Sequence, residues 1–515
     1  TQTVTDTAIA GTPVYTYTYD ALNRPDITTI SNYPGGNKTL NNDYNRFGHR
    51  NTLTFTDSSG SVTHQYTYNK LGQLSSATLP GTQTFTGFEY FANNQLKHIT
   101  APGGINLDYT YETNGPVKTI GYTNGAVSLD NLSYTYDATR NVDTLTNTNG
   151  LHDYNYDNLY RLTGATHPVS SGLPTAESFT YDDAGNRENP ADLAAYDYDN
   201  NNRITTSPGV TSYGFDADGN TTSKTGGEIF GYNHNNQLTS YSKTGTTASY
   251  VYDAAARRIN KTVNGTATWY LWDGSKLLAE YNSSGTRTKR YAYLPNNFAP
   301  VQMADSTGTY NVLSNHLQTP ILLTNSSNQI VWRANYEAFG KATINDDVDG
   351  NGARITFNVR MPRQYYDVES NLNYNHHRYY STELGRYITS DPIGLLGGMN
   401  TYSYAENNPI NWIDPYGLVD LAVIPIRSEL TTHFPTELSN QEVKDVASFM
   451  ADQVGWGDLN ALRKKDPEAI KALEDRVREA LKDADADTQK LFEWLDALKK
   501  AYEEAEKDKK ECEGK

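Results

Sequence analysis

The stretch YTYTYD (Tyr15–Asp20) sets the pattern that governs most of this 515-residue chain. Tyr15, Tyr17 and Tyr19 alternate with threonine, so their three rings share one face of a β-strand. The aspartate that follows can accept hydrogen bonds from nearby backbone N–H groups and so begin a turn. An aromatic residue followed by Asp, Asn or Glu therefore predicts the end of a strand and the start of a turn.

This pair recurs along the first 300 residues at spacings of 17 to 25 residues, if weaker copies at Tyr44, Tyr90 and Tyr293 are included. Turn-forming residues and a second short segment follow each copy, as in DNLYRLTG (Asp157–Gly164). One hairpin of this kind is too small to bury its own apolar face, but stacked hairpins can bury it. The repeats therefore predict a β-solenoid or spiralling sheet over residues 1–300. The clear copies are Tyr19-Asp20, Tyr68-Asn69, Tyr111-Glu112, Tyr136-Asp137, Tyr156-Asp157, Tyr181-Asp182, Tyr198-Asp199, Phe215-Asp216, Tyr232-Asn233, Tyr252-Asp253 and Trp272-Asp273.

We interpret these pairs as structural: the ring fills the pleated face and the acidic or amide side chain holds the turn. The alternative is that exposed rings contact carbohydrate. Composition agrees with a β-repeat protein: the hydrophobic content is only 37%, but 40 Tyr bring large rings to bury, and 39 Gly suit a β-rich chain with many turns. The net charge of −17 argues against nucleic acid as the main partner of the β part.

Several other classes of protein are excluded or disfavoured by the sequence. No apolar run approaches the length of a transmembrane helix. The single cysteine, Cys512, excludes a disulfide framework and a cysteine-based zinc site. The length predicts two or more structural units. The chain begins TQTVTDTAIA, without Met or a signal peptide, so we expect a piece of a longer protein.

The composition changes after Leu418. Residues 419–515 are rich in Ala, Glu, Lys and Leu at helical spacing, and Ser439 with Glu442 forms a capping box. This predicts a small helical domain. It contains no HExxH, no GxSxG and no His/Asp cluster, so no catalytic toxin motif is visible, and a partner-binding or membrane-active module is the alternative.

The repeats resemble the YD-repeat, or RHS-repeat, family. The match is most specific in RMPRQYYDVESNLNYNHHRYYSTELGRYITSDPIGLLGGMNTYSYAENNPINWIDPYGL (Arg360–Leu418), which resembles the RHS-associated core, and NHLQTPILLTNSSNQIVWRANYEAFG (Asn315–Gly340) resembles the segment before it. One departure is Arg363, where the family usually has Gly, which leaves the local turn geometry open. The resemblance implies repeats at 1–300, a core at 301–418 and a variable C-terminal domain at 419–515.

The core contains nearly the same five letters twice, DPIGL from Asp391 and DPYGL from Asp414. The second copy completes the pattern P-x-x-x-x-D-P-x-G-L, with Pro409, Pro415 and Gly417, which resembles the self-cleavage motif of RHS proteins and Tc-toxin C components. By that resemblance the cut bond joins Leu418 to Val419.

The same resemblance implies that Asp391 and Asp414 form a pair like that of aspartic proteases. It also implies that Arg386 polarises the carbonyl or positions Asp391. Two adjacent carboxylates cannot both ionise cheaply, so one activates water while the other protonates or polarises the carbonyl. A lone DPxG is only a good turn; two copies, the upstream proline and the change of composition favour cleavage.

Two further motifs are interpreted as structural. NDDVDGNG (Asn345–Gly352) begins like a calcium loop, but Thr356 stands where an EF-hand has Glu, so a polar turn is preferred. His376 and His377 are neighbours on an expected strand and would point to opposite faces, which disfavours joint metal binding. We expect no metal and no cofactor.

The resemblance implies a bacterial toxin-delivery protein, secreted or at the cell surface. Its β-sheet would form part of a hollow shell that encloses the C-terminal domain as cargo and frees it by a single-turnover, aspartic-type self-cleavage. Expected partners are an immunity protein and components of a secretion system, type VI among them. The alternative is a non-enzymatic surface scaffold that adheres or binds glycans.

Overall fold

A computed structural model of the chain describes residues 2–5, 13–22, 24–81, 83–113, 115–188, 196–418 and 421–422. Thr1–Arg427 form one compact unit and Ser428–Lys515 a second, and every described residue belongs to the first. The helical domain predicted at 419–515, including its capping box, lies outside the described residues, except that Leu421–Ala422 form a strand.

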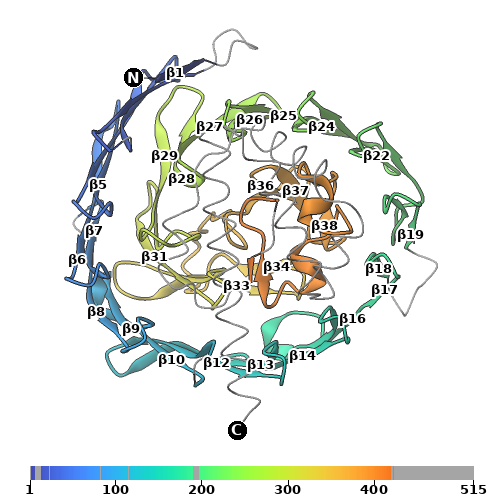
Figure 1. The fold of residues 1–515 in the computed structure, drawn as a ribbon, viewed down its shortest axis with the longest axis horizontal. Helices are drawn as coiled ribbons and strands as arrows, with labels where there is room; N and C mark the ends of the chain where they lie inside the picture. The colour runs from blue at the N-terminus through green and yellow to red at the C-terminus, as the bar shows by residue number, and fades with distance from the viewer. Residues whose placement is uncertain are drawn as a thin grey trace, which may run out of the picture. The chain divides into compact units, whose positions relative to one another are not determined.

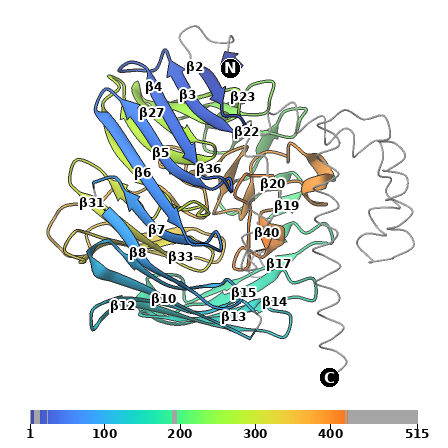
Figure 2. The ribbon, with the colours of Figure 1, turned by 60° about the vertical axis from the view of Figure 1, so that its left-hand side comes forward.

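The first unit is built from antiparallel strands that follow one another in sequence order. The N-terminal sheet has 16 strands among the described residues, and each pairs with the next along the chain. Figure 2 shows β2 to β10 of this sheet side by side. The strands are β1 (Gln2–Thr5), β2 (Val14–Tyr19), β3 (Pro25–Ser31), β4 (Lys38–Tyr44), β5 (Arg50–Asp57), β6 (Gly60–Tyr68), β7 (Leu74–Leu79), β8 (Gln83–Tyr90), β9 (Leu96–Ala101), β10 (Ile105–Tyr111), β11 (Val117–Asn124), β12 (Val127–Tyr136), β13 (Val142–Asn147), β14 (Gly150–Tyr156), β15 (Leu162–Thr166) and β16 (Ala176–Ser178).

A second long sheet follows after two short hairpins, and within the described residues it has 14 strands in sequence order. The short hairpins are β17 (Thr180–Tyr181) with β18 (Arg187–Glu188), and β19 (Asp197–Tyr198) with β20 (Ile204–Thr206). The long sheet consists of β21 (Tyr213–Phe215), β22 (Thr221–Lys224), β23 (Glu228–Tyr232), β24 (Leu238–Lys243), β25 (Thr246–Tyr252), β26 (Arg258–Val263), β27 (Thr266–Asp273), β28 (Lys276–Asn282), β29 (Arg287–Ala292), β30 (Gln302–Ala304), β31 (Thr309–Ser314), β32 (Pro320–Thr324), β33 (Ile330–Tyr336) and β34 (Ala342–Asn345).

The core segment adds a four-stranded sheet and a final short hairpin. These strands are β35 (Tyr365–Asp367), β36 (Leu372–Asn375), β37 (Arg378–Ser381), β38 (Arg386–Tyr387), β39 (Trp412–Ile413) and β40 (Leu421–Ala422). The helical turns among the described residues are all 3-10 turns: η1 (Pro102–Gly104), η2 (Val169–Ser171), η4 (Gly394–Gly397) and η5 (Ala405–Asn407). No helix in this described part is long and apolar enough to cross a lipid bilayer.

The two long sheets wind in a spiral (Figure 1). Strands of the second sheet pack on strands of the first: Leu53 and Phe55 share a buried cluster with Leu271 and Tyr281. A second cluster joins β6–β15 to β29–β32 in the same way. The core sheet β35–β38 packs against the second long sheet through a third cluster. Stacking therefore buries the apolar face that a single hairpin leaves open, and the predicted spiralling sheet is confirmed.

The repeated Tyr-Asp pair holds each hairpin in two ways, as Tyr156 and Asp157 illustrate. Asp157 Oδ1 accepts the N–H groups of Leu159 (2.9 Å) and Arg161 (3.0 Å), so the carboxylate closes the turn. The Tyr156 hydroxyl donates to the carbonyl oxygen of Val142, in the preceding hairpin (2.8 Å). The structural interpretation of the pair is confirmed. The same hydroxyl-to-carbonyl bond joins Tyr68 to Arg50, Tyr90 to Leu74, Tyr111 to Leu96, Tyr232 to Thr221 and Tyr252 to Leu238.

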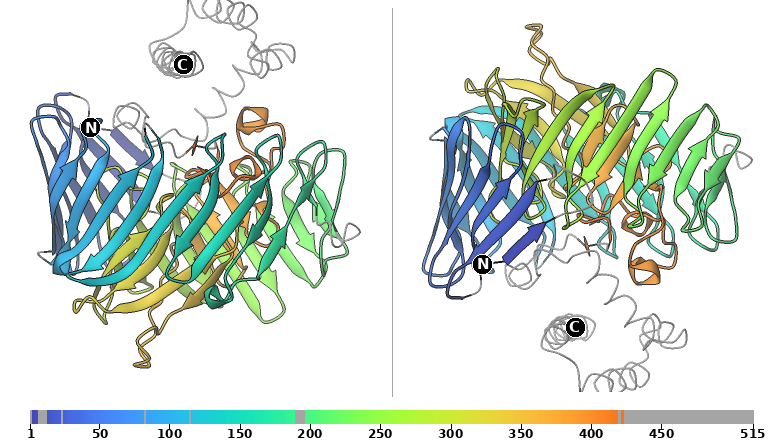
Figure 3. Two further views of the ribbon diagram at one scale, coloured as in Figure 1. Left: turned by 90° about the horizontal axis from the view of Figure 1, so that it is seen from below. Right: turned by 90° about the horizontal axis from the view of Figure 1, so that it is seen from above.

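The acidic loop Asn345–Gly352 projects beyond β34 (Figure 3) and closes on itself. The Asp347 carboxylate accepts the N–H of Gly352 at 3.1 and 3.2 Å, and Asn345 Oδ1 accepts the N–H of Asp347 at 3.1 Å. The carboxylate and amide therefore serve a polar turn, as preferred from the sequence.

The expected placement of the two histidines is wrong. His376 and His377 form the turn between β36 and β37, and their ring centroids lie 4.6 Å apart. They lie together because a turn does not have the alternating faces of a strand. Within the described ranges, no group of three His, Cys, Asp or Glu residues could hold a metal ion.

Candidate functional site

The two predicted carboxylates meet at one side chain. Asp391 and Asp414 are 6% and 0% exposed. Both reach the same nitrogen of Arg378, whose Nη2 lies 2.8 Å from Asp391 Oδ2 and 3.0 Å from Asp414 Oδ2. The structure thus brings together the pair that the doubled motif predicted, through an arginine that the sequence analysis did not single out.

Strand β37 places Arg378 at this point. Its guanidinium lies 3.6 Å from the ring centroid of Tyr387, on β38, and its Nε donates to the carbonyl oxygen of Gly417 at 2.7 Å. Its Nη1 donates to the carbonyl oxygen of Thr401 at 3.1 Å. One buried cation therefore holds both carboxylates and the segments that carry them. Its signal in the sequence is a charged residue that begins the apolar strand RYYS.

Asp414 holds the turn that ends at Leu418. Its Oδ1 accepts the N–H groups of Leu418 (2.9 Å) and Tyr416 (3.3 Å), and its Oδ2 accepts the Tyr387 hydroxyl (2.8 Å). Burial and the neighbouring Asp414 raise the pKa of Tyr387 well above its ordinary value, so this hydroxyl remains a donor. Gly417 has φ 69°, and a Cβ there would stand 2.5 Å from the carbonyl oxygen of Asn375, so the motif requires glycine at this position.

Asp391 differs from Asp414 in its electrostatics. Burial raises the pKa of Asp391 to about 7, and Asp414 adds to the rise, although Arg378 and the N–H of Ile393 act in the opposite direction. Its Oδ1 accepts the Ile393 N–H at 3.0 Å. A Cβ atom added to Gly397 would come too close to both Asp391 Oδ2 and the carbonyl oxygen of Leu418. These two oxygens therefore lie on the same side of Gly397. The carboxyl that titrates near neutral pH thus lies beside the carbonyl of the bond predicted to be cut.

The described hydrogen bonds of Arg386, the other predicted site residue, go to repeat turns and not to the two carboxylates. Its Nη1 donates to Asn186 Oδ1 at 3.2 Å and its Nη2 to the carbonyl oxygen of Asn202 at 2.5 Å. Its guanidinium lies 4.9 Å from the ring centroids of Tyr198 and Tyr402. Arg386 therefore joins the core to two repeat turns, and Arg378 occupies the place beside the carboxylates.

The segment between the two carboxylates is bound to the first unit's repeat turns by asparagines. Asn408, next to the motif residue Pro409, donates to Asn141 Oδ1 (3.0 Å) and to the carbonyl oxygen of Tyr160 (2.8 Å). Three consecutive residues before it have positive φ, with values of 50, 47 and 60° at Ala405, Glu406 and Asn407. Such backbone persists only where the surroundings hold it. The other asparagine contacts run from Asn400 to Asn186, from Asn407 to Gly185 and from Asn411 to Tyr156.

The backbone conformation at Arg363 explains why the family usually has glycine at this position. Its φ is 63°, in the left-handed region that side chains rarely adopt. Its guanidinium lies 4.3 Å from the ring centroid of Tyr416, which belongs to the DPYGL turn, and 4.9 Å from that of Phe298. The side chain thus packs on two aromatic rings while its backbone takes this conformation.

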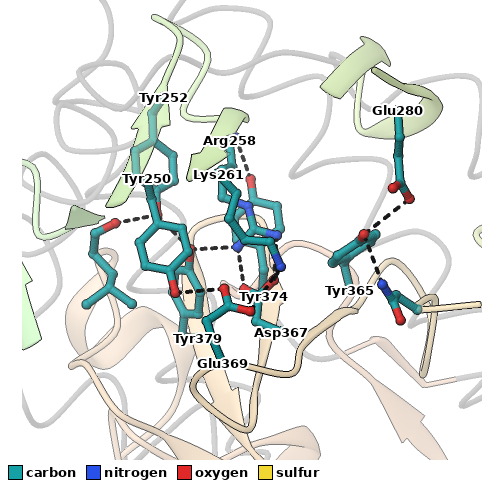
Figure 4. Close-up of polar contacts among 12 residues, drawn as sticks. Tyr250, Tyr252, Arg258, Lys261, Glu280, Tyr365, Asp367, Glu369, Tyr374 and Tyr379 are labelled. Atoms are coloured by element: carbon teal, nitrogen blue, oxygen red, sulfur yellow. Dashed lines mark hydrogen bonds and ion pairs between the residues drawn. The ribbon is translucent and has the colours of Figure 1, made fainter. Parts of the chain in front are cut away.

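A buried network of charges fixes the core sheet to the second long sheet (Figure 4). The Arg258 guanidinium pairs with Asp367, and Lys261 Nζ lies 2.8 Å from Asp367 and 3.1 Å from Glu369. Arg258 also donates to the Tyr379 hydroxyl at 3.0 Å. Burial alone would raise the pKa of Asp367, but the two cations bring it below its ordinary value. Because Tyr379 follows Arg378 on β37, this network orients the strand that carries the site.

The chain was compared with known proteins. The Teneurin YD-shell family matches residues 116–410. The tRNA nuclease WapA of Bacillus subtilis is 30% identical over 376 residues, which cover 69% of this chain and 16% of that protein. The double-stranded DNA deaminase toxin A of Burkholderia cenocepacia is 31% identical over 198 residues, 33% of this chain and 14% of the toxin. This chain therefore spans less than a fifth of either relative.

Among solved structures, the complex TcdB2-TccC3 without its hypervariable C-terminal region has the same fold. Its TM-score is 0.64 at 20% identity, over 79% of this chain and 24% of that chain. The chain belongs to the YD-shell family, the RHS or YD-repeat proteins.

Proposed function

We propose that this YD-shell unit cuts its own chain once, between Leu418 and Val419. One observation carries the proposal: two buried aspartates share one nitrogen of Arg378 at 2.8 and 3.0 Å, and both lie against Leu418. Asp414 binds the N–H of Leu418, and Asp391 lies beside its carbonyl oxygen. The chain itself supplies the substrate, so the entropy of bringing the bond to the carboxyls is already spent in folding.

The geometry suggests different roles for the two aspartates. Asp391 donates its proton to the Leu418 carbonyl oxygen, while Asp414 accepts a proton from a water whose oxygen bonds to the Leu418 carbonyl carbon. The bond to the Val419 nitrogen then breaks, this nitrogen takes the proton from Asp414, and Asp391 recovers its own. Arg378 compensates the charge of the pair and holds the Gly417 carbonyl at 2.7 Å, which fixes the approach of the next residue.

Cleavage would separate the described unit from residues 419–515. The relatives include a DNA deaminase toxin and a tRNA nuclease, and the solved TcdB2-TccC3 complex is described by a hypervariable C-terminal region. By analogy, residues 419–515 are the cargo: a variable effector that the shell encloses and releases during toxin delivery or competition between bacteria. Secretion-system components and an immunity protein are the partners this role requires.

The test is intact-mass measurement of the full chain over time. The wild type should yield one fragment that ends at Leu418 and one that begins at Val419. Asp391→Asn and Asp414→Asn should keep the chain whole, because an amide can neither donate an acidic proton nor accept one from water. Asp183→Asn, in an exposed repeat turn, is the matched control and should be cut like the wild type. A wild-type chain that stays whole would overturn the proposal.

The role of residues 419–515 has its own test. Expression of this segment in the cytoplasm and in the periplasm of a bacterium should arrest growth in one compartment. Unimpaired growth in both would contradict the effector role and leave self-cleavage untouched.

The tyrosines favour this function over the adhesive scaffold. Among the tyrosines that the structure describes, only Tyr160 is exposed, at 53%. The other described tyrosines are buried or partly buried, and many use their hydroxyls to join hairpins, so they offer few fully exposed rings to a sugar.

A further inference from the structure

The loop that leads away from Asp391 contains three glycines that serve different purposes. Gly394 and Gly398 have φ values of 60 and 131°, a backbone conformation that favours glycine, and nothing lies within 4 Å of the point where a Cβ would stand. Gly397 does not belong to the positive-φ residues. Its backbone would accept a side chain, so another constraint explains the glycine.

That constraint is space. A Cβ on Gly397 would stand 2.8 Å from Asp391 Cγ, closer still to Asp391 Oδ2, and 2.8 Å from the carbonyl oxygen of Leu418. Real Cβ atoms essentially never come so close to their neighbours. The point where that Cβ would stand is thus close to both the Asp391 carboxyl and the Leu418 carbonyl oxygen.

Neither neighbour can move away easily. The Leu418 oxygen is backbone, and its residue is fixed by the bond from the Leu418 N–H to Asp414 at 2.9 Å. Asp391 is held by Arg378 at 2.8 Å and by the N–H of Ile393 at 3.0 Å, and its own N–H donates to Thr401 at 2.9 Å. A side chain at position 397 would have to push apart two groups that the rest of the site holds together.

We propose that Gly397 is a positioning residue for self-cleavage: its missing side chain lets the Asp391 carboxyl reach the Leu418 carbonyl oxygen. This inference rests on the proposed self-cleavage. Proton transfer requires the two oxygens to be in hydrogen-bond reach, directly or through one water. A methyl group at position 397 would fill that path, and a displacement of about 1 Å can slow a reaction about 100-fold.

The experiment is a pulse-chase of the full chain in cell-free translation, in which the half-time of cleavage is measured for Gly397→Ala and Gly394→Ala. Gly397→Ala should lengthen the half-time about 100-fold. Gly394→Ala imposes more backbone strain in the same loop but leaves the space open, so its half-time should stay close to that of the wild type. Equal half-times for Gly397→Ala and the wild type would overturn the inference.

A pH profile distinguishes positioning from a general loss of structure. A methyl group beside Asp391 removes water from a carboxyl that already faces Arg378, Asp414 and the Ile393 N–H, so the pH midpoint of residual cleavage should rise by about one unit. Gly394→Ala should leave the midpoint in place. An unchanged midpoint in Gly397→Ala would contradict the inference.

A double substitution covers the case in which Gly397→Ala folds poorly. In the Asp391→Ala background the carboxyl is gone, so Gly397→Ala should lower the unfolding temperature less than it does in the wild type. An equal loss in both backgrounds would refute a clash with this carboxyl. Failure of the inference is separable from failure of the proposed function: in the first case Asp391→Asn still blocks cleavage, and in the second the wild type is never cut.

Discussion

At the scale of single residues, the two aspartates are alike in sequence and unlike in surroundings. Asp414 accepts hydrogen bonds from four donors: Arg378, Tyr387, Tyr416 and Leu418. Asp391 accepts from Arg378 and Ile393 and lies beside a backbone carbonyl oxygen, an arrangement that favours the protonated carboxyl. In the self-cleavage that we propose, this asymmetry assigns the proton donor to Asp391 and the base to Asp414, which also anchors the Leu418 turn.

The first prediction concerns pH. Burial raises the pKa of Asp391 to about 7. The protonated carboxyl that donates the proton is therefore fully populated at lower pH, and its population falls as the pH rises through that value. The initial rate of cleavage should therefore fall above about pH 7, with Asp183→Asn showing the same profile. A rate that increases across pH 7 would assign the opposite role to Asp391.

The same proton affects stability. Because the folded-state pKa of Asp391 lies above the unfolded one, the stability that this proton contributes is complete below about pH 4 and disappears as the pH rises through about 7.

The sequence predicted the aspartates and missed the arginine for a physical reason. Asp391 and Asp414 stand at the same place in a repeated turn, and the resemblance to self-cleaving RHS proteins pairs them. Arg378 belongs to neither copy, and it reaches both only because β37 and β38 pair and place it over the Tyr387 ring. Arg386 fitted a motif by letter, but its side chain lies among the repeat turns.

At the scale of elements, the buried charges between β26 and β35 decide whether the core sheet is held. Arg258 and Asp367 are 1% and 0% exposed, and Lys261 brings a second cation to the same carboxylate. Such a network adds little beyond well-packed apolar groups, but the removal of one partner leaves the others charged in a dry interior.

The second prediction follows from this imbalance. Asp367→Asn should lower the free energy of unfolding by about 3 to 5 kcal/mol, because Arg258 and Lys261 lose their common counter-ion. The matched control is Asp346→Asn, whose partner Arg354 is 75% exposed, and it should cost less than about 1 kcal/mol. Denaturant titration followed by tryptophan fluorescence measures both. A loss for Asp367→Asn as small as that of the control would show that the network does not hold the core sheet.

The hairpins themselves were predictable because their signals are local. Alternating apolar residues and an Asx turn lie within one short segment, and the structure has a strand and a turn at each pair. The hydroxyl of each repeat tyrosine was not predictable, because its acceptor lies in the preceding hairpin: Tyr68 reaches Arg50 and Tyr136 reaches Val117. Pairing between repeats depends on register, which composition does not encode.

At the scale of the whole described unit, the repeats position the chemistry. The asparagines of the segment between the two aspartates bind the backbone and side chains in the turns of three hairpins. These contacts explain why the core contains so many asparagines. The amide side chain both donates and accepts hydrogen bonds, so it can pair with backbone N–H and C=O groups of a turn that the turn itself leaves without a partner. The repeat turns therefore help to support the site.

The third prediction tests that support through Asn408, which is 2% exposed and binds two different repeat turns. Asn408→Ala removes both bonds and should cost about 1 to 3 kcal/mol of stability, because buried acceptors on the repeat turns lose their donor. It should also slow self-cleavage about tenfold or more, since the Asp414 turn begins six residues later and small displacements are costly. The control is Asn235→Ala, at an exposed turn of the second sheet, which should be cut like the wild type. Cleavage half-times and thermal unfolding are measured on the same preparations. If Asn408→Ala is destabilised but cut at the wild-type rate, the repeat turns do not position the carboxylates, and the β37–β38 hairpin and Arg378 alone set the site.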